Sequence, residues 1–244
     1  MKKTFYFIVL ISALVAPQIS LANVQQYFAF NGIKGNGHVV KKERAVSDFH
    51  AINVSGGIDI YIIPGQVEKA VVETDENMQE SIITIVGDGV LKIYCSKSIN
   101  IFNKMNVYVY VKELDKVTAS GGSDVYAETN LNFPSLSIDM TGGSDLTLKC
   151  STHELKCSLT GGSDATISGS ADKADLEATG GSDIKASGLT IGRCKIEVTG
   201  GSDAYLNVTG ELSVVASGGS DVTYTGNAKV VSKSVTGASD LIRK

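Results

Sequence analysis

The chain is poor in the residues on which most catalytic sites depend. Its 244 residues include no tryptophan, four cysteines and only three histidines, His38, His50 and His153, which are scattered along the sequence. There is no P-loop, no H-E-x-x-H or G-x-S-x-G motif, and no zinc-type pairing of cysteines. Because a general base needs a partner within reach, we interpret the histidines as packing or turn residues. The sequence therefore argues against an enzyme and predicts no catalytic or cofactor-binding residue.

A basic cluster is also missing. The formal net charge is −4, from 22 lysines and arginines against 26 aspartates and glutamates. A mildly acidic chain without a basic cluster is a poor match for nucleic acid or for an anionic membrane surface. We therefore expect neither as a partner.

Long apolar runs are absent except at the start. Two lysines precede an apolar run from Phe5 to about Ala16, and small residues follow at Ser20 and Ala22. This pattern predicts a secretory signal peptide over residues 1–22. No later stretch reaches the ~18 consecutive apolar residues of a spanning helix. We expect an exported protein, in the periplasm, at the cell surface or outside the cell, with no membrane span once the signal is removed.

Glycine, in contrast, is abundant, and 15 of the 26 glycines lie in one repeated pentapeptide. The copies read SGGID at 55–59, SGGSD at 120–124 and 217–221, TGGSD at 141–145, 160–164, 179–183 and 199–203, and TGASD at 236–240. From the second copy on, the aspartate recurs every 18 to 21 residues. A repeat near twenty residues is typical of a solenoid, whose corners absorb small insertions.

Apolar and polar residues alternate on both sides of each pentapeptide. Leu155, Cys157 and Leu159 precede one corner, with Lys156 and Ser158 between them. A period of two predicts strands with one buried face. The sequence therefore predicts an all-β fold, a single-stranded parallel β-helix with coils of about 19–21 residues, each a strand, a short turn, a second strand and a GGSD corner. The preference for right-handed crossovers predicts a right-handed helix.

The β-helix is expected to occupy residues 46–244, after an N-terminal leader or edge segment at 23–45. The step from Asp59 to Asp124 is 65 residues, which predicts about three further coils with enlarged loops. No stretch after residue 45 shows a convincing helical period.

Each corner is expected to need glycine, because glycine reaches positive φ without a steric penalty. The glycines assigned to this role are Gly121, Gly142, Gly161, Gly180, Gly200 and Gly218. The same reasoning extends to Gly181, whose replacement by valine is predicted to strain its corner.

The repeated aspartates are expected to form a column along the stack. Its members are Asp124, Asp145, Asp164, Asp183, Asp203 and Asp221. Unit charges at the ~4.8 Å strand spacing repel by roughly 0.8 kcal/mol even in water, so another interaction must offset the repulsion. We favour carboxylates that accept hydrogen bonds from turn N–H groups and hydroxyls. The alternative is a row of Ca²⁺ ions in a calcium-stabilised repeat protein.

Export permits disulfides, and Cys150 and Cys157 are the candidate pair. Both are expected to point inward on strands that flank a turn at 151–154, where facing sheets converge. The alternative is two free thiols packed in the core.

Residues 39–63 (VVKKERAVSDFHAINVSGGIDIYII) and 71–94 (VVETDENMQESIITIVGDGVLKIY) resemble the opening of the head GIN domain family. The shared features are Arg44 after basic residues, Phe49 followed by alternating apolar residues, and Gly-Gly-x-Asp at 56–59. The later GGSD corners resemble the family's repeats, so the resemblance covers nearly the whole mature chain. It implies a β-helical fold and an exported location, and it implies no activity and no catalytic residue.

Fold and export predict a non-enzymatic binding or structural module of the cell envelope, and the resemblance implies that it is bacterial and adhesin-like. Outward Tyr61, Tyr126 and Tyr205 each lie two residues after a corner aspartate and are candidate contacts for a glycan or protein ligand. They are expected to lie far apart in the stack, and tyrosine is also common in strands, so we favour a structural role for them. A second interpretation, by analogy of fold alone, is a β-helical carbohydrate-active enzyme such as a polysaccharide lyase or hydrolase.

Overall fold

The structure, a computed structural model, describes residues 32–244. The predicted signal peptide at 1–22 and the start of the predicted leader at 23–45 lie outside the described residues. Within 32–244 the strands form one 17-stranded and one 2-stranded sheet. A short 3₁₀ helix, η1, connects two consecutive strands of the larger sheet. The predicted all-β class is confirmed.

The elements of residues 32–244 form two groups, an N-terminal part and the regular repeat that follows it. The N-terminal part contains β1 (Ile33–Lys34), β2 (Val39–Arg44), β3 (Ala51–Ser55), β4 (Asp59–Pro64), β5 (Lys69–Asp75), η1 (Glu76–Ser81), β6 (Ile82–Gly87), β7 (Val90–Cys95), β8 (Ile99–Ile101) and β9 (Met105–Val111). The repeat contains β10 (Lys116–Ser120), β11 (Val125–Asn132), β12 (Ser135–Thr141), β13 (Leu146–Thr160), β14 (Ala165–Thr179), β15 (Ile184–Gly200), β16 (Ala204–Gly218), β17 (Val222–Thr225), β18 (Lys229–Val235) and β19 (Leu241–Arg243).

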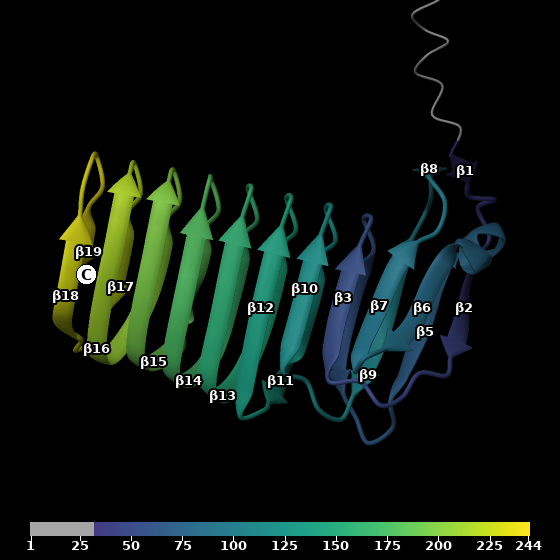
Figure 1. The fold of residues 1–244 in the computed structure, drawn as a ribbon, viewed down its shortest axis with the longest axis horizontal. Helices are drawn as coiled ribbons and strands as arrows, with labels where there is room; N and C mark the ends of the chain where they lie inside the picture. Colours follow the sequence, from purple (N-terminus) through teal and green to yellow (C-terminus); the bar gives the residue numbers. More distant parts are fainter. Residues whose placement is uncertain (1–31) are drawn as a thin grey trace, which may run out of the picture. The chain divides into compact units, whose positions relative to one another are not determined.

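From β10 onward the chain winds as a stack of parallel coils (Figure 1). The long strands β13, β14, β15 and β16 pair in parallel, so that Cys157 lies beside Leu176, Leu176 beside Ile196, and Ile196 beside Val214. The tight loops that follow the strand ends lie in one row along an edge of the stack (Figure 1). The predicted parallel β-helix, with its GGSD corners in one column, is confirmed, and its handedness stays a prediction.

The core lies inside the coils as columns of apolar side chains. Leu155, Cys157 and Leu159 are buried, whereas Lys156 is exposed and Ser158 is half-buried. This alternation follows from strand geometry, which points successive side chains to opposite faces. One coil cannot bury its apolar face alone, so the stack is expected to fold as a unit.

The turn predicted at 151–154 does not interrupt the sheet. β13 continues from Leu146 to Thr160 and keeps pairing with β14 through Ser151, Thr152 and Glu154. The chain bends here while its backbone groups stay paired with those of neighbouring coils, as buried backbone requires. This gradual bend replaces the predicted reversal.

The 65-residue step between Asp59 and Asp124 does not contain three coils, contrary to the prediction. β3 and β4 pair directly with β10 and β11, for example Ser55 with Ser120. On their other sides, β3 pairs in parallel with β7 and β4 with β9. The chain therefore leaves the first coil, builds one further layer beyond it, and returns to continue the stack on the opposite side.

Antiparallel strands, which the repeat does not contain, cover this extra layer. β5 pairs with β2 and with β9, and β6 pairs with β7. β2 lies within the segment predicted as a leader or edge. An open parallel edge presents unpaired N–H and C=O groups to other chains, so the antiparallel strands act as a cap for the N-terminal end of the stack.

Asp75, at the end of β5, connects the cap to two loops, one before β2 and one between β8 and β9. Its buried carboxylate accepts hydrogen bonds from the N–H of Gly37 at 2.7 Å, the N–H of Asn103 at 2.9 Å and the side-chain amide of Asn103 at 3.0 Å. The bond from the Asn103 N–H is the main cause that lowers the pKa of the Asp75 carboxyl, and it does so against the effect of burial.

The lowered pKa makes the stability of the cap depend on pH. A carboxyl whose pKa is lower in the folded chain contributes stability above its unfolded pKa of about 4, and loses that contribution as the pH falls through the folded pKa. We expect Asp75→Asn to cost about 2 kcal/mol at neutral pH and to reduce the loss of stability on acidification below about pH 4. Urea unfolding between about pH 3 and pH 7 measures both effects. Equal acid sensitivity in the variant and the wild type would contradict this role for Asp75.

All four cysteines carry free thiols, and Cys150, Cys157 and Cys194 are buried. The predicted Cys150–Cys157 bridge is therefore not formed in the structure, where the two side chains occupy separate positions of the core. Burial raises the pKa of Cys150 to about 11 and that of Cys157 and Cys194 to about 12.

Thiol labelling distinguishes free thiols from the bridge. Because the thiolate is the reactive form, the native protein at about pH 8 is expected to label at the half-buried Cys95 and to leave the three buried thiols unmodified. The protein unfolded without reductant is expected to label at all four cysteines. If only Cys95 and Cys194 label after unfolding, the predicted Cys150–Cys157 disulfide is present in the protein.

Candidate functional site

The GGSD corners are built on glycines in the left-handed region of backbone space. φ is 68° at Gly121, 73° at Gly142, 75° at Gly161, 93° at Gly180, 91° at Gly200 and 89° at Gly218. A side chain at these positions would be strained. Gly181 is not in that region, and no neighbouring atom lies within 4 Å of where its Cβ would be. The prediction that valine at 181 strains the corner is therefore wrong, because in that corner the first glycine makes the sharp turn.

The serine of each corner belongs to a buried hydrogen-bonded ladder. The Oγ of Ser182 accepts a bond from the N–H of Ser163 at 3.1 Å and donates to the carbonyl of Thr179 at 3.1 Å. The N–H of Ser182 in turn donates to the Oγ of Ser202 at 3.1 Å. The same N–H to Oγ bond joins successive corners along the stack. Buried polar groups are tolerated when they are paired, and the ladder pairs them.

The corner aspartates form a second ladder beside the serines. The N–H of Asp183 donates to Oδ1 of Asp164 at 3.1 Å, and the N–H of Asp203 donates to Oδ1 of Asp183 at 3.0 Å. This bond recurs along the column. Hydrogen bonds to ionised acceptors are strong, so they offset the repulsion between stacked carboxylates. The donor is a turn N–H, and it belongs to the corner of the next coil.

Calcium dependence separates the two interpretations of the aspartate column. Ca²⁺ takes about six to eight oxygen ligands, whereas one oxygen of each interior carboxylate already accepts a backbone N–H. Within residues 32–244 no three or more His, Cys, Asp and Glu side chains are grouped so as to hold a metal. We expect the Tm to be the same in Ca²⁺ and in EDTA. A rise of several degrees in Ca²⁺ that is abolished by Asp164→Asn with Asp183→Asn would contradict the hydrogen-bonded interpretation.

Three tyrosines stack near the N-terminal end of the solenoid. The ring centroids of Tyr61 and Tyr108 lie 5.0 Å apart, and those of Tyr61 and Tyr126 lie 4.9 Å apart. The prediction that Tyr61 and Tyr126 lie far apart is wrong, because β4 pairs directly with β11. Both faces of Tyr61 are covered, and Lys41 lies 4.6 Å from the ring centroid of Tyr108. Since the ring faces are used within the protein, we interpret this row as stabilising the stack. Tyr205, the third candidate, is exposed and lies outside the row.

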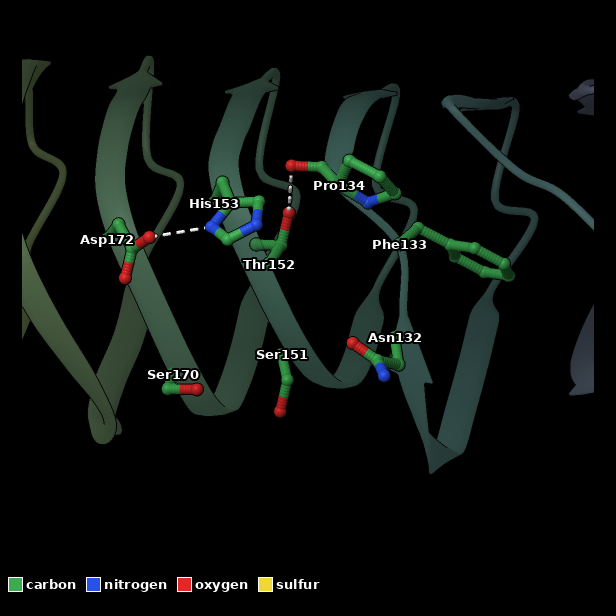
Figure 2. A pocket seen from close by; sticks show the side chains of 8 residues that line it. All are labelled: Asn132, Phe133, Pro134, Ser151, Thr152, His153, Ser170 and Asp172. Carbon is green, nitrogen blue, oxygen red and sulfur yellow. Dashed lines mark hydrogen bonds and ion pairs between the residues drawn. The ribbon is translucent and has the colours of Figure 1, made fainter.

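The bends midway between the GGSD corners carry a groove. Its first hollow, about 330 Å³, is drawn in Figure 2 and is lined by Asn132, Phe133, Pro134, Ser151, Thr152, His153, Ser170 and Asp172. A second hollow shares His153 and Asp172 and extends to Arg193 and Glu211. A third shares Phe133 and reaches His50 and Asp115. The three hollows therefore follow one another along the stack.

Two rows of side chains border the groove, and part of each is visible in Figure 2. Residues of the polar row pair in register from coil to coil, and they are Asn132, Ser151, Ser170, Thr190 and Asn207. The first three line the first hollow, and Thr190 and Asn207 continue the row on the next two coils. The second row begins with His153 and Asp172, and glycines follow at 192 and 210. These glycines open the second hollow because they carry no side chain, and a Cβ at Gly192 would lie 2.6 Å from the carbonyl oxygen of Asp172.

Every charged residue that lines the first two hollows has a partner of opposite sign. His153 Nδ1 lies 2.7 Å from Asp172, Lys173 lies 3.5 Å from Glu154, and Arg193 lies 3.0 Å from Glu211. These side chains are about half exposed or more, so each pair adds little to stability. The pairing leaves these two hollows polar but without a dominant charge.

The sequence-based reasoning missed this groove because it followed the repeated corners, and the groove lies at the bends between them. Its polar row can be found by aligning the coils at their period of about twenty residues, which places Ser151, Ser170 and Thr190 in one column. His50 was interpreted as a packing or turn residue, but it is exposed and lies 2.9 Å from Asp115. The pairing of β3 with β10, which the sequence did not reveal, places this ion pair beside the groove.

Comparisons with known proteins agree with this architecture. A solved protein from Bacteroides fragilis, described as a putative adhesin, has a TM-score of 0.76 and 22% identity, covering 87% of this chain and 98% of that chain. A protein from Parabacteroides merdae with the same description has a TM-score of 0.69 and 24% identity, covering 87% and 99%. One from Parabacteroides distasonis, described as a putative lipid binding protein, has a TM-score of 0.72 and 20% identity, covering 87% and 99%. At these identities the likeness shows the fold.

The comparison with curated proteins finds no match. In the part of the chain that the structure describes, no helix is long and apolar enough to span a membrane. The profile of one family matches residues 48–228, a region that holds the first coil, most of the cap and most of the repeat. The chain therefore belongs to the family described as "Putative auto-transporter adhesin, head GIN domain".

Proposed function

We propose that this chain is an exported, non-enzymatic, adhesin-like binding module of the bacterial cell envelope, and that it binds its ligand in the groove at the bends. The observation that carries the proposal is the polar row. Within residues 32–244, the side chains of Asn132, Ser170 and Thr190 are exposed and make no hydrogen bond to the protein. A regular stack offers such a row as a long, pre-formed face for an extended ligand.

Family membership and the fold support this proposal. The family is described as "Putative auto-transporter adhesin, head GIN domain", and two of the similar structures are described as putative adhesins. The predicted signal peptide at 1–22 supports export. A rigid site also limits the entropy lost on binding, and the serine and aspartate ladders are expected to hold the coils rigidly in register.

The His–Asp pairs of the groove favour binding over catalysis. A general base works when it is positioned against a reacting group and its pKa is tuned by its surroundings. The side chains of His153 and Asp172 are each 78% exposed, so solvent surrounds the pair. We therefore assign them to the border of a binding surface.

A blocking substitution tests the location of the site. Purified wild-type protein is screened against defined panels of glycans and extracellular proteins and against intact cells, beside Ser170→Arg and Thr166→Arg. Both positions are exposed on β14, but only Ser170 lines the groove. We expect Ser170→Arg to reduce binding at least tenfold and Thr166→Arg to leave it within about twofold. Equal binding by both variants would place the site elsewhere, and breakdown of a polysaccharide would replace the proposal with an enzyme.

A further inference from the structure

We propose that the ligand of the groove is a neutral glycan chain that lies along the stack, across successive coils. The inference rests on the proposed function and adds the chemical class of the ligand. Three properties of the groove lead to it: the pairing of its charges, the regular spacing of its neutral polar groups, and an aromatic ring at one end.

The paired charges argue against a charged ligand. Lys173 and Arg193, the lysine and arginine that line the first two hollows, already have carboxylate partners at 3.5 and 3.0 Å. An anionic polysaccharide or acidic peptide would have to displace those carboxylates, and a basic ligand would have to displace the cations. Like charges brought together across an interface cost several kcal/mol. A neutral ligand leaves all the pairs in place.

The polar row suits a ligand rich in hydroxyl groups. Its serine and threonine hydroxyls both donate and accept hydrogen bonds, and its asparagine amides do the same through separate atoms. The five residues of the row lie on successive coils at ~4.8 Å intervals, so the row extends over ~19 Å. Several linked sugar rings would span that length and present hydroxyls at regular intervals. A peptide would instead offer backbone groups that alternate in direction along the strand.

Phe133 supplies an apolar surface at one end of the polar row. It is half-buried, packs against the core, and lines three neighbouring hollows. Pro134 beside it is exposed. Aromatic rings bury a large apolar area while holding their position, and a sugar ring has an apolar C–H face that such a surface can cover. The close-up in Figure 2 shows Phe133 beyond the first members of both rows.

Matched double variants test the ligand class. The probes are neutral linear hexasaccharides (cello-, xylo- and manno-oligosaccharides), with oligogalacturonate and heparin fragments as anionic counterparts. The groove variant is Ser170→Ala with Thr190→Val, which removes two hydroxyls of the row. The control is Thr147→Val with Thr166→Val, which removes two outward hydroxyls that pair in register on the same sheet, away from the groove. Calorimetric titration gives the dissociation constants, and unfolding midpoints show that each variant is folded.

We expect at least one neutral series to bind, with affinity rising from disaccharide to hexasaccharide, and the anionic fragments not to bind. The groove variant should weaken binding about tenfold, because two hydrogen bonds to the ligand are lost, and Phe133→Ala should weaken it about three- to tenfold. The control should remain within about twofold. If a protein or an anionic glycan binds instead, and Ser170→Arg blocks it, the neutral-glycan inference is wrong while the groove stands as a site. If Ser170→Arg affects no binding, the proposed function fails as well.

Discussion

Gly169→Ala is expected to lower the free energy of unfolding by about 3–5 kcal/mol, which is large for one added methyl group. Gly169 lies in β14 with φ at 109°, outside the range of ordinary side chains. A Cβ at this position would overlap the carbonyl oxygen of Cys150 in the preceding coil. Relief would require β13 and β14 to separate where Cys150 pairs with Gly169. Backbone strain and overpacking each typically cost about 1–3 kcal/mol, and here they act together.

Gly181→Ala provides the matched control for this substitution. Gly181 has ordinary φ and open space at its Cβ, so we expect a change within about 0.5 kcal/mol. Gly180→Ala should fall between the two, because its φ is 93° but its nearest neighbour, the N of Gly161, would be 3.4 Å from the Cβ. Thermal and urea midpoints of the three variants give the order. An equal loss of unfolding free energy in Gly169→Ala and Gly181→Ala would show that the backbone around residue 169 accommodates the methyl group without strain.

The regular part of the fold could be predicted because the sequence repeats a physical constraint once per coil. Leu155, Cys157 and Leu159 alternate with polar residues, and the corner serine and aspartate recur at the same place in each turn. Identical coils stack most simply in parallel, so period, burial and corner position all indicate one architecture. The inward phase assigned to these residues agrees with their burial.

The N-terminal layer could not be predicted in the same way. Its strands show the same alternation as the repeat, and alternation does not say whether a strand pairs in parallel or antiparallel fashion. The 65 residues from Asp59 to Asp124 were therefore compatible with three further coils and also with the single extra layer that the structure shows. This error also affected the predicted ligand contacts, because the direct pairing of β4 with β11 stacks Tyr61 on Tyr126. That row uses ring faces that the sequence had suggested for a ligand.

The groove was missed for a different physical reason. Its residues are ordinary surface types, and none has a feature that marks it as functional by itself. Ser170 and Thr190 gain meaning only when the stack brings them into one row, and Gly192 opens a hollow only because Asp172 stands beside it in the preceding coil. A solenoid thus makes a binding surface from residues about twenty positions apart, each weak as a sequence signal.

The corner serines are expected to contribute more to stability than their size suggests, and Ser182→Ala tests this. The Oγ of Ser182 accepts hydrogen bonds from the N–H groups of Ser163 at 3.1 Å and Gly162 at 3.2 Å, and donates to the carbonyl of Thr179. Alanine would leave the N–H of Ser163 without its buried partner, whereas Gly162 is exposed and the carbonyl of Thr179 still accepts from the N–H of Gly161 at 3.4 Å. A buried donor that loses its partner costs about 1–3 kcal/mol, and the bond to Gly162 adds a smaller loss, so we expect a total loss of about 2–3 kcal/mol.

Ser170→Ala, on β14 in the same coil, is the control for Ser182→Ala. Its hydroxyl is exposed and makes no hydrogen bond to the protein within residues 32–244, so the change should be within about 0.5 kcal/mol. Urea unfolding measures both free energies, and hydrogen exchange at Gly162 and Ser163 reports whether those N–H groups have lost protection. Because each coil contacts only its neighbours, faster exchange should centre on the 160–164 and 179–183 corners and fade along the stack. A loss below about 1 kcal/mol with unchanged exchange would show that the serine ladder follows from the stacking of the coils and does not hold them together.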